Sequence, residues 1–244
     1  MPPDSRENRA PRAAPRAVLS WSTGKDAAYA LHRLRQEGSY DVVALLTTVV
    51  SGTGRVATHG VRSELLTQQA EAAGLPLTRV ALPPSPPNVV YESAMASALR
   101  RFLKLGIRHV VFGDLFLEDI RRYREHQLAQ LGMECVFPLW GLDTGRLARE
   151  MISAGLEARF VSVDTQRIPA DWAGRPFDAR WLQEVPPGVD PCGENGEFHT
   201  FVTAGPMLRH AIPVRIGARS ERSGMASVDL RSQLPRPPRL RRPA

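Results

Sequence analysis

The 244-residue chain has a formal net charge of +7, and 43% of its residues are hydrophobic, enough for one large domain or two small ones. It has no apolar run near the ~20 residues that cross a bilayer. Its Pro- and Arg-rich start lacks a signal-peptide apolar region, so we expect a cytoplasmic protein without membrane partners. The two cysteines, Cys135 and Cys192, exclude a disulfide framework, and no Cys/His spacing is typical of a zinc site.

The positive charge is concentrated at the two ends of the chain. Residues 209–244 carry nine arginines and two acids, and residues 1–16 carry four arginines and two acids, so residues 17–208 have a net charge of −2. We therefore expect a nearly neutral folded region between disordered tails at residues 1–16 and 217–244. A solvated basic C-terminal tail is favoured over a nucleic-acid-binding arm, so nucleic acid is not an expected partner.

Short apolar runs alternate with helical patterns through the first half of the chain. Strands are predicted at residues 16–21, 40–50, 77–82 and 108–113, and helices at residues 26–37, 61–74 and 92–106. This alternation predicts a doubly wound parallel α/β sheet. Ligands are expected at the carboxyl ends of its strands.

After Gly113 the alternation becomes less regular. A charged helix is predicted at residues 117–132, a second helix at 144–155, and strands at 133–140, 157–164 and near 210–216. We therefore expect a first domain over residues 17–114 and a smaller α/β subdomain over residues 115–216.

The segment "STGKDA", Ser22–Ala27, connects the first predicted strand to the first predicted helix. The chain takes nearly all its positive charge from arginine and has only two lysines, Lys25 and Lys104. A helix N-terminus presents unpaired N–H groups and partial positive charge, which suits phosphate, and Lys25 adds a compact full charge. Asp26 is a candidate helix cap or Mg²⁺ ligand. The segment predicts an anion-binding loop.

Two other phosphate-binding motifs do not account for the chain. A Walker loop requires glycine five residues before its Gly-Lys pair, and that position is Leu19. "GTGRVA", residues 52–57, fits a dinucleotide fingerprint, but the acid expected about twenty residues later, Glu71, lies within a predicted helix. A plain Gly-rich loop is therefore favoured for residues 52–57.

The loop resembles the SGGKDS loop of the N-type ATP pyrophosphatases, which are PP-loop, adenine nucleotide alpha hydrolase-like enzymes that split ATP into AMP and pyrophosphate. The blocks "THGVRSELLTQQAEAAGLPL", "FGDLFLEDIRRYRE", "FPLWG" and "DPCGENGEFHTFV" resemble, in order, those of diphthine–ammonia ligase and its uncharacterised prokaryotic relatives. The resemblance covers roughly residues 17–206. It implies a PP-loop fold in which residues 17–114 form an ATP pyrophosphatase domain.

The chain departs from the family pattern at four positions. Thr23 replaces the middle glycine of the loop, and Ala27 replaces its closing serine. Where the ligases resemble each other in GEGGEYET, Asn195 replaces a glycine and His199 a glutamate. The last two changes fall where substrate is expected, so the resemblance implies ATP chemistry more firmly than diphthine as the acceptor.

The resemblance implies site residues of two kinds. Catalysis is expected from Lys25 and Asp26, with Asp26 also holding Mg²⁺, and ATP binding from the whole loop: Ser22, Thr23, Gly24, Lys25, Asp26 and Ala27. Acceptor contacts are expected from Arg121, Glu125, Glu194, Glu197 and His199. From the residues alone, an intrahelical ion pair explains Arg121 and Glu125 as well. A solvated turn explains the other three.

The implied activity is an AMP- and pyrophosphate-forming ligation of ammonia to a carboxylate acceptor, using ATP and Mg²⁺. A protein or a small metabolite can supply the carboxylate. A tRNA-modifying PP-loop enzyme and an ATP-binding sensor without turnover are the alternatives. The tRNA enzyme would require a basic folded surface and a catalytic cysteine pair, and the near-neutral 17–208 segment speaks against it.

Overall fold

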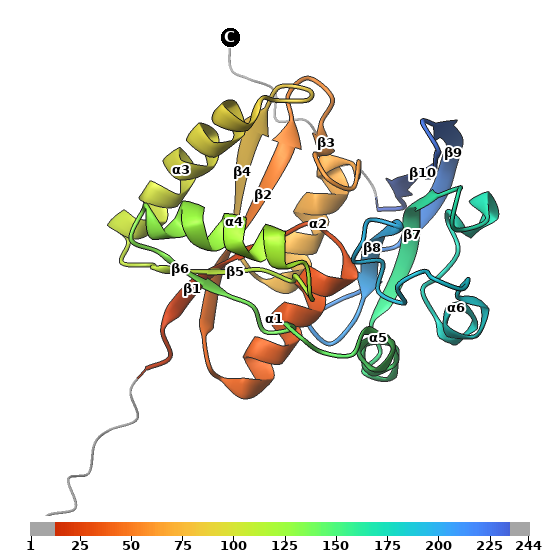
Figure 1. The fold of residues 1–244 in the computed structure, drawn as a ribbon, viewed down its shortest axis with the longest axis horizontal. Helices are drawn as coiled ribbons and strands as arrows, with labels where there is room; N and C mark the ends of the chain where they lie inside the picture. The colour runs from red at the N-terminus through yellow and green to blue at the C-terminus, as the bar shows by residue number, and fades with distance from the viewer. Residues whose placement is uncertain (1–12, 235–244) are drawn as a thin grey trace, which may run out of the picture.

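The structure is a computed structural model that describes residues 13–234 (Figure 1). Of the two predicted disordered tails, residues 1–12 and 235–244 lie outside the described residues. Within 13–234, no helix has the length and apolar character needed to cross a membrane.

The first half of the chain forms a mainly parallel sheet, sheet A. Its strands are β1 (Arg16–Ser20), β2 (Asp41–Val50), β3 (Arg55–Val56), β4 (Leu77–Leu82), β5 (His109–Val111) and β6 (Glu134–Val136). β1 lies between β2 and β5; β2 also pairs with β4, and β5 with β6, all in parallel. The short β3 runs antiparallel to the carboxyl end of β2. The predicted doubly wound α/β sheet is confirmed.

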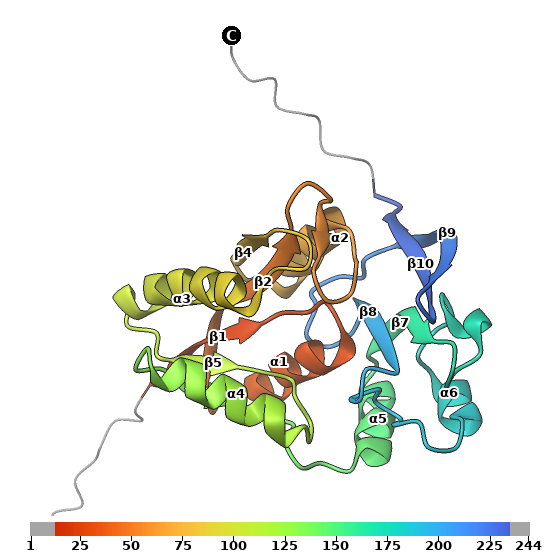
Figure 2. The same cartoon turned by 45° about the horizontal axis from the view of Figure 1, so that its top comes forward.

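Four helices cover the two faces of sheet A (Figure 2). They are α1 (Lys25–Glu37), α2 (Ser63–Ala73), α3 (Asn88–Lys104) and α4 (Glu118–Ala129). The alternation of β1 assigns the faces: Ala17 and Leu19 pack in the core with α1 and α2, whereas Val18 packs with α3 and α4.

Helix α1 forms because its apolar residues recur at helical spacing on the side that faces the sheet. Ala27, Ala30, Leu31 and Leu34 are all buried. Gly38 ends the helix at φ 63°, where its N–H donates to the Leu34 carbonyl, a conformation that favours glycine. At the other end, Gly24 takes the N-cap position, so the expected capping role of Asp26 is wrong; Asp26 lies in the first turn.

The second half forms an antiparallel sheet, sheet B, in the order β8-β7-β10-β9. It rests on an aromatic cluster in which Phe160 of β7 contacts Trp172, Phe177, Trp181 and Phe198. Its elements, in chain order, are α5 (Thr144–Ser153), β7 (Glu157–Asp164), the 3-10 helix η1 (Ala170–Trp172), α6 (Ala179–Glu184), β8 (Phe198–Ala204), β9 (Val214–Arg222) and β10 (Met225–Ser232).

The expected boundary between residues 114 and 115 is too early. β6 pairs in parallel with β5, so α4 and β6 complete a crossover of sheet A. Sheet A therefore ends at Val136, and the elements of the second unit begin with α5 at Thr144. The charged surface of α4 hides this relation in the sequence, since only Leu128 of that helix is fully buried.

The predicted tails also begin at the wrong residues. Arg16 already belongs to β1, and residues 217–232 form most of the β9–β10 hairpin rather than a disordered segment. Their basic composition conceals the alternation of β10, where Ala226, Val228 and Leu230 face inward. Three guanidinium groups, those of Arg55, Arg62 and Arg231, pair with Asp229 of the hairpin.

Candidate functional site

A cavity of about 260 Å³ lies at the carboxyl ends of β1 and β5. The chain leaves β1 through α1 on one face of sheet A and leaves β5 through α4 on the other, so a crevice forms between the two strand ends. Gly113 permits the close approach of the two segments, because a Cβ there would lie 2.8 Å from the Ala27 nitrogen. We call this space the loop cavity; its polar lining includes Ser22, Lys25, Asp26, Thr47, Thr48, His59, Asp114, Arg124, Glu194, His199 and Thr200.

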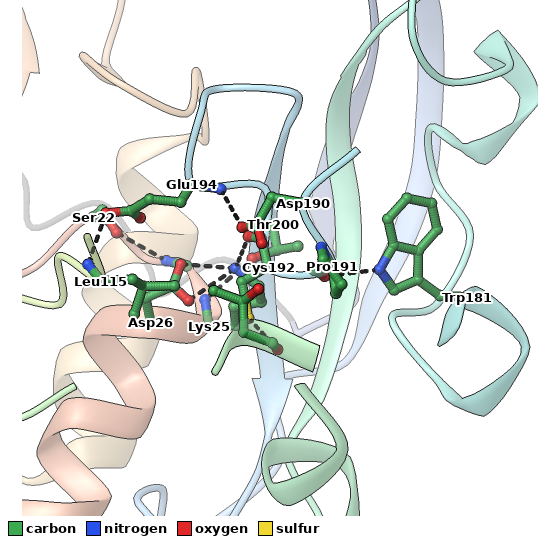
Figure 3. A network of polar contacts seen from close by, with 12 residues as sticks. Ser22, Lys25, Asp26, Leu115, Trp181, Asp190, Pro191, Cys192, Glu194 and Thr200 are labelled. Carbon is green, nitrogen blue, oxygen red and sulfur yellow. Dashed lines mark hydrogen bonds and ion pairs between the residues drawn. The ribbon is translucent and has the colours of Figure 1, made fainter. Parts of the chain in front are cut away.

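Lys25 is held at the floor of the loop cavity, with only 2% of its side chain exposed (Figure 3). Its Nζ lies 2.8 Å from both carboxylate oxygens of Asp26 and also donates to the Cys192 carbonyl. Burial by itself lowers the pKa of Lys25, but Asp26, Cys192 and Glu194 more than offset this, and the pKa is raised. Lys25 is therefore a fixed positive charge.

Strand β8 of sheet B binds the backbone of the Ser22–Ala27 loop. The Lys25 N–H donates to Thr200 Oγ1 of β8 at 3.1 Å, and the Val202 N–H donates to the Thr23 carbonyl at 3.1 Å. Gln69 of α2 donates to the carbonyls of both Thr23 and Val202. The loop conformation therefore depends on two elements that are distant in sequence, β8 and α2.

Thr23 does not line the loop cavity. It is fully buried, adopts φ 77°, and its Oγ1 has no hydrogen-bond partner among residues 13–234. A left-handed conformation costs a side-chain-bearing residue about 1–2 kcal/mol. The chain thus keeps the backbone conformation that glycine favours at this position and carries the strain. Gly24 and Ala27 also lie outside the lining, whereas Ser22, Lys25 and Asp26 contribute to it.

Glu194 links the second unit to the loop after β5. Its Oε1 accepts from the Leu115 N–H at 2.7 Å, and its own N–H donates to Asp190 Oδ2 at 2.9 Å (Figure 3). Burial raises the pKa of Glu194 to about 7, against the lowering effect of the Leu115 hydrogen bond. This carboxyl group therefore exchanges protons near neutral pH.

Glu197 supports the turn of residues 190–197. It is 1% exposed, and its Oε1 accepts from the Asp190 N–H at 3.0 Å and from Asn195 Nδ2 at 3.1 Å, with Arg167 at 3.1 Å. It does not line the loop cavity. The structure therefore places Glu197 behind the surface on which we expected acceptor contacts.

His199 lines the loop cavity together with His59, and their rings stack at 4.6 Å between centroids. Burial lowers the pKa of His199 to about 4, and Lys25 adds to this effect. Burial, followed by the charges of His199 and Lys25, lowers the pKa of His59 well below its ordinary range. Both rings are thus neutral at pH 7, so they offer hydrogen bonds without charge.

Arg121 and Glu125 form an ion pair on the surface of α4, with Nε and Oε1 2.8 Å apart. Arg121 also lies over the ring of Trp140 at 4.7 Å, and neither residue lines the loop cavity. Their neighbour Arg124 lines it instead and contacts Asp114 at 2.7 Å. Sequence reasoning missed both residues, although Asp114 directly follows a predicted strand end.

The lining as a whole suits an anion near Lys25. Small residues bring the backbone close to the cavity, the N-terminus of α1 opens into it, and Lys25 supplies a full charge. Among residues 13–234, no three His, Cys, Asp or Glu side chains converge on one point as a metal site. Both oxygens of Asp26, the expected Mg²⁺ ligand, contact Lys25.

The comparisons with known proteins agree with this architecture. Residues 15–135 match the family model of the diphthamide synthase N-terminal domain, and residues 143–231 match that of the C-terminal domain. The gap between the two matches coincides with the boundary between sheet A and α5.

Curated relatives point the same way. The chain is similar to the diphthine–ammonia ligase of Danio rerio, at 31% identity over 159 residues, 59% of this chain and 62% of that protein. It is similar to the diphthine–ammonia ligases of Bos taurus and Homo sapiens, each at 32% identity over 104 residues, 40% of this chain and 39% of each relative. The matches thus span from about two fifths to three fifths of the relatives' length. The chain belongs to the diphthamide synthase family, as a PP-loop protein related to diphthine–ammonia ligase.

Proposed function

We propose that the protein is an ATP-dependent ligase that joins ammonia to a carboxylate acceptor, with AMP and pyrophosphate as products. The observation that carries the proposal is the buried Lys25 ammonium at the strand-end crevice, in a chain similar to diphthine–ammonia ligases. A carboxylate oxygen attacks the α-phosphorus of ATP and displaces pyrophosphate. Ammonia then attacks the acyl carbon, AMP leaves, and a proton is released.

Lys25 and the start of α1 supply the electrostatic part of this reaction. Negative charge accumulates on the leaving pyrophosphate, and a charge held in a site shielded from water stabilises it by a few kcal/mol. Asp26 and the Cys192 carbonyl hold the Lys25 ammonium group beside the cavity. Bound Mg²⁺ would neutralise further phosphate charge, and Asp26, 27% exposed, remains its candidate ligand.

Glu194 is the candidate proton acceptor for the second half of the reaction. It lines the loop cavity with Lys25, and its pKa of about 7 leaves it partly ionised at neutral pH. A base of this strength accepts a proton efficiently from ammonium or from the attacking nitrogen. His199 lines the same wall as a neutral hydrogen-bonding group.

The tRNA-modifying alternative receives no support from the cysteines. Burial raises the pKa of the Cys135 thiol to about 12 and raises the pKa of the Cys192 thiol well above its usual range. A sulfur-transferring enzyme needs a thiolate, which these surroundings disfavour.

The test is to incubate the protein with MgATP, ammonium and a panel of carboxylic acids and to separate the nucleotides formed. We expect AMP, and ADP as the product would contradict the proposal. The two lysines provide a matched pair: Lys25→Met should abolish AMP formation, and Lys104→Met, at an exposed position on α3, should leave it unchanged. ATP binding without AMP release for every acid would favour the sensor instead.

A further inference from the structure

A groove of about 360 Å³ lies between α3 and α4, beside the loop cavity. Glu92 of α3 joins the two helices across it: its Oε1 accepts from the Tyr123 hydroxyl and from Gln127 Nε2, each at 3.1 Å. Both helices cover the face of sheet A opposite α1 and α2 (Figure 2). We call it the α3–α4 groove.

The floor of the α3–α4 groove is apolar, and its volume is that of a small-molecule site. Met95, Leu99, Phe112 and Leu128 line it, and Val89 at its edge is 70% exposed. Ligand sites are typically cavities of ~300–1,000 Å³ in which apolar walls predominate and a few polar groups set the orientation. The groove has both features.

The groove and the loop cavity share part of their walls. Tyr91, Met95 and Arg124 line both spaces. Arg124 lies over the Phe112 ring at 4.3 Å and contacts Asp114, where its Nε is 2.7 Å from Oδ2. Arg124 Nη2 also donates to Asp114 Oδ1 at 3.2 Å, so the guanidinium group is already paired with one carboxylate. An arginine that pairs with carboxylates therefore lies where the two spaces meet.

We propose that the α3–α4 groove binds the apolar body of the acceptor, a small monocarboxylate whose carboxylate lies at Arg124 and faces the loop cavity. This inference rests on the proposed function, since the carboxylate must reach the space beside Lys25 to react. The groove shares Tyr91, Met95 and Arg124 with that space and offers an apolar surface for the rest of the molecule. A second charge on that body is disfavoured at the floor, where Met95, Leu99, Phe112 and Leu128 offer it no partner, and the Glu92 carboxylate on the wall repels a second carboxylate; Arg100, which also lines the groove, is the residue that could pair with it.

Equilibrium binding of a homologous series tests the inference. Propionate, butyrate, pentanoate, hexanoate and succinate are titrated calorimetrically into the full chain with α,β-methylene-ATP, which prevents turnover. Burial of one methylene is expected to lower Kd about three- to fourfold, so hexanoate should bind at least tenfold more tightly than propionate. Succinate should bind no better than propionate.

Two exposed serines of α3 supply matched variants. Ser93 lines the α3–α4 groove and Ser97, one turn later, does not. Ser93→Trp should weaken hexanoate binding at least tenfold, because the indole occupies the groove, and Ser97→Trp should leave it unchanged. Affinity for the ATP analogue should be the same in both variants.

Either of two results would overturn the inference: a Kd independent of chain length, or an equal effect of the two tryptophan variants. AMP release measured in parallel separates this inference from the proposed function. Chain-length-dependent binding without AMP would contradict the ligase and support the groove. AMP release that ignores both chain length and Ser93→Trp would support the ligase and contradict the groove.

Discussion

Thr23→Gly should stabilise the protein, although Thr23 is fully buried. The threonine adopts φ 77°, which costs about 1–2 kcal/mol relative to glycine. Its buried Oγ1 lacks a partner, and such a group costs about 1–3 kcal/mol. Both costs disappear with the side chain.

Two opposing effects reduce the gain. Removing the buried methyl group forfeits about 1 kcal/mol of apolar burial. Glycine also loses more backbone freedom on folding, at about 0.5–1 kcal/mol. The balance is a net stabilisation of about 0–3.5 kcal/mol. The backbone contacts of residue 23 survive, since its carbonyl still accepts from Gln69 and from the Val202 N–H.

Urea denaturation measures this balance as a shift of the unfolding midpoint, provided that the m value, the dependence of the unfolding free energy on urea concentration, is unchanged. Thr23→Val is the control, because it removes the unpaired hydroxyl and keeps both the branched shape and the backbone strain. We expect both variants to be more stable than wild type, because both remove the unpaired hydroxyl. If Thr23→Gly lowers the unfolding free energy by more than 1 kcal/mol, the strain argument is wrong and packing of the side chain dominates.

Three further predictions concern the site and the contacts that hold it. Lys25→Met should lower the unfolding free energy, measured by urea denaturation, by about 2–4 kcal/mol, because it leaves the 27% exposed Asp26 carboxylate without its partner. Adding Asp26→Asn should recover part of the loss. His199 has a folded-state pKa of about 4, below its unfolded value, so the unfolded chain is protonated first and the contribution of His199 to stability is lost as pH decreases from about 7.5 to 5. Over that interval the unfolding free energy of His199→Gln should decrease by about 2 kcal/mol less than that of the wild type. Equal pH dependence of stability in the two proteins would contradict a neutral His199 ring. Asp143→Ala should cost about 1 kcal/mol in thermal unfolding, because Asp143 Oδ1 caps α5 by accepting from the Arg146 N–H at 2.7 Å, whereas Asp143→Asn should cost much less.

Features set by local sequence were predictable. Neighbours within a few residues determine the apolar runs of β1 and β2, the helical spacing of α1 and its end at Gly38. The loop between β1 and α1 likewise has a recognisable local pattern. The family resemblance, carried by that loop and by the block at residues 190–202, was confirmed for the same reason.

The arrangement of the site depended on contacts between distant segments, which no local pattern reports. Lys25 reaches the Cys192 carbonyl across 167 positions, and Glu194 reaches the Leu115 N–H across 79. Sequence spacing placed Arg121, Arg124 and Glu125 on one short helix, but only the packing of α4 on sheet A decides that Arg124 alone enters the cavity. Likewise, the composition around Glu197 and of residues 217–232 predicts solvent-exposed segments. Both are ordered by distant partners: Arg167 pairs with Glu197, and β7 pairs with β10.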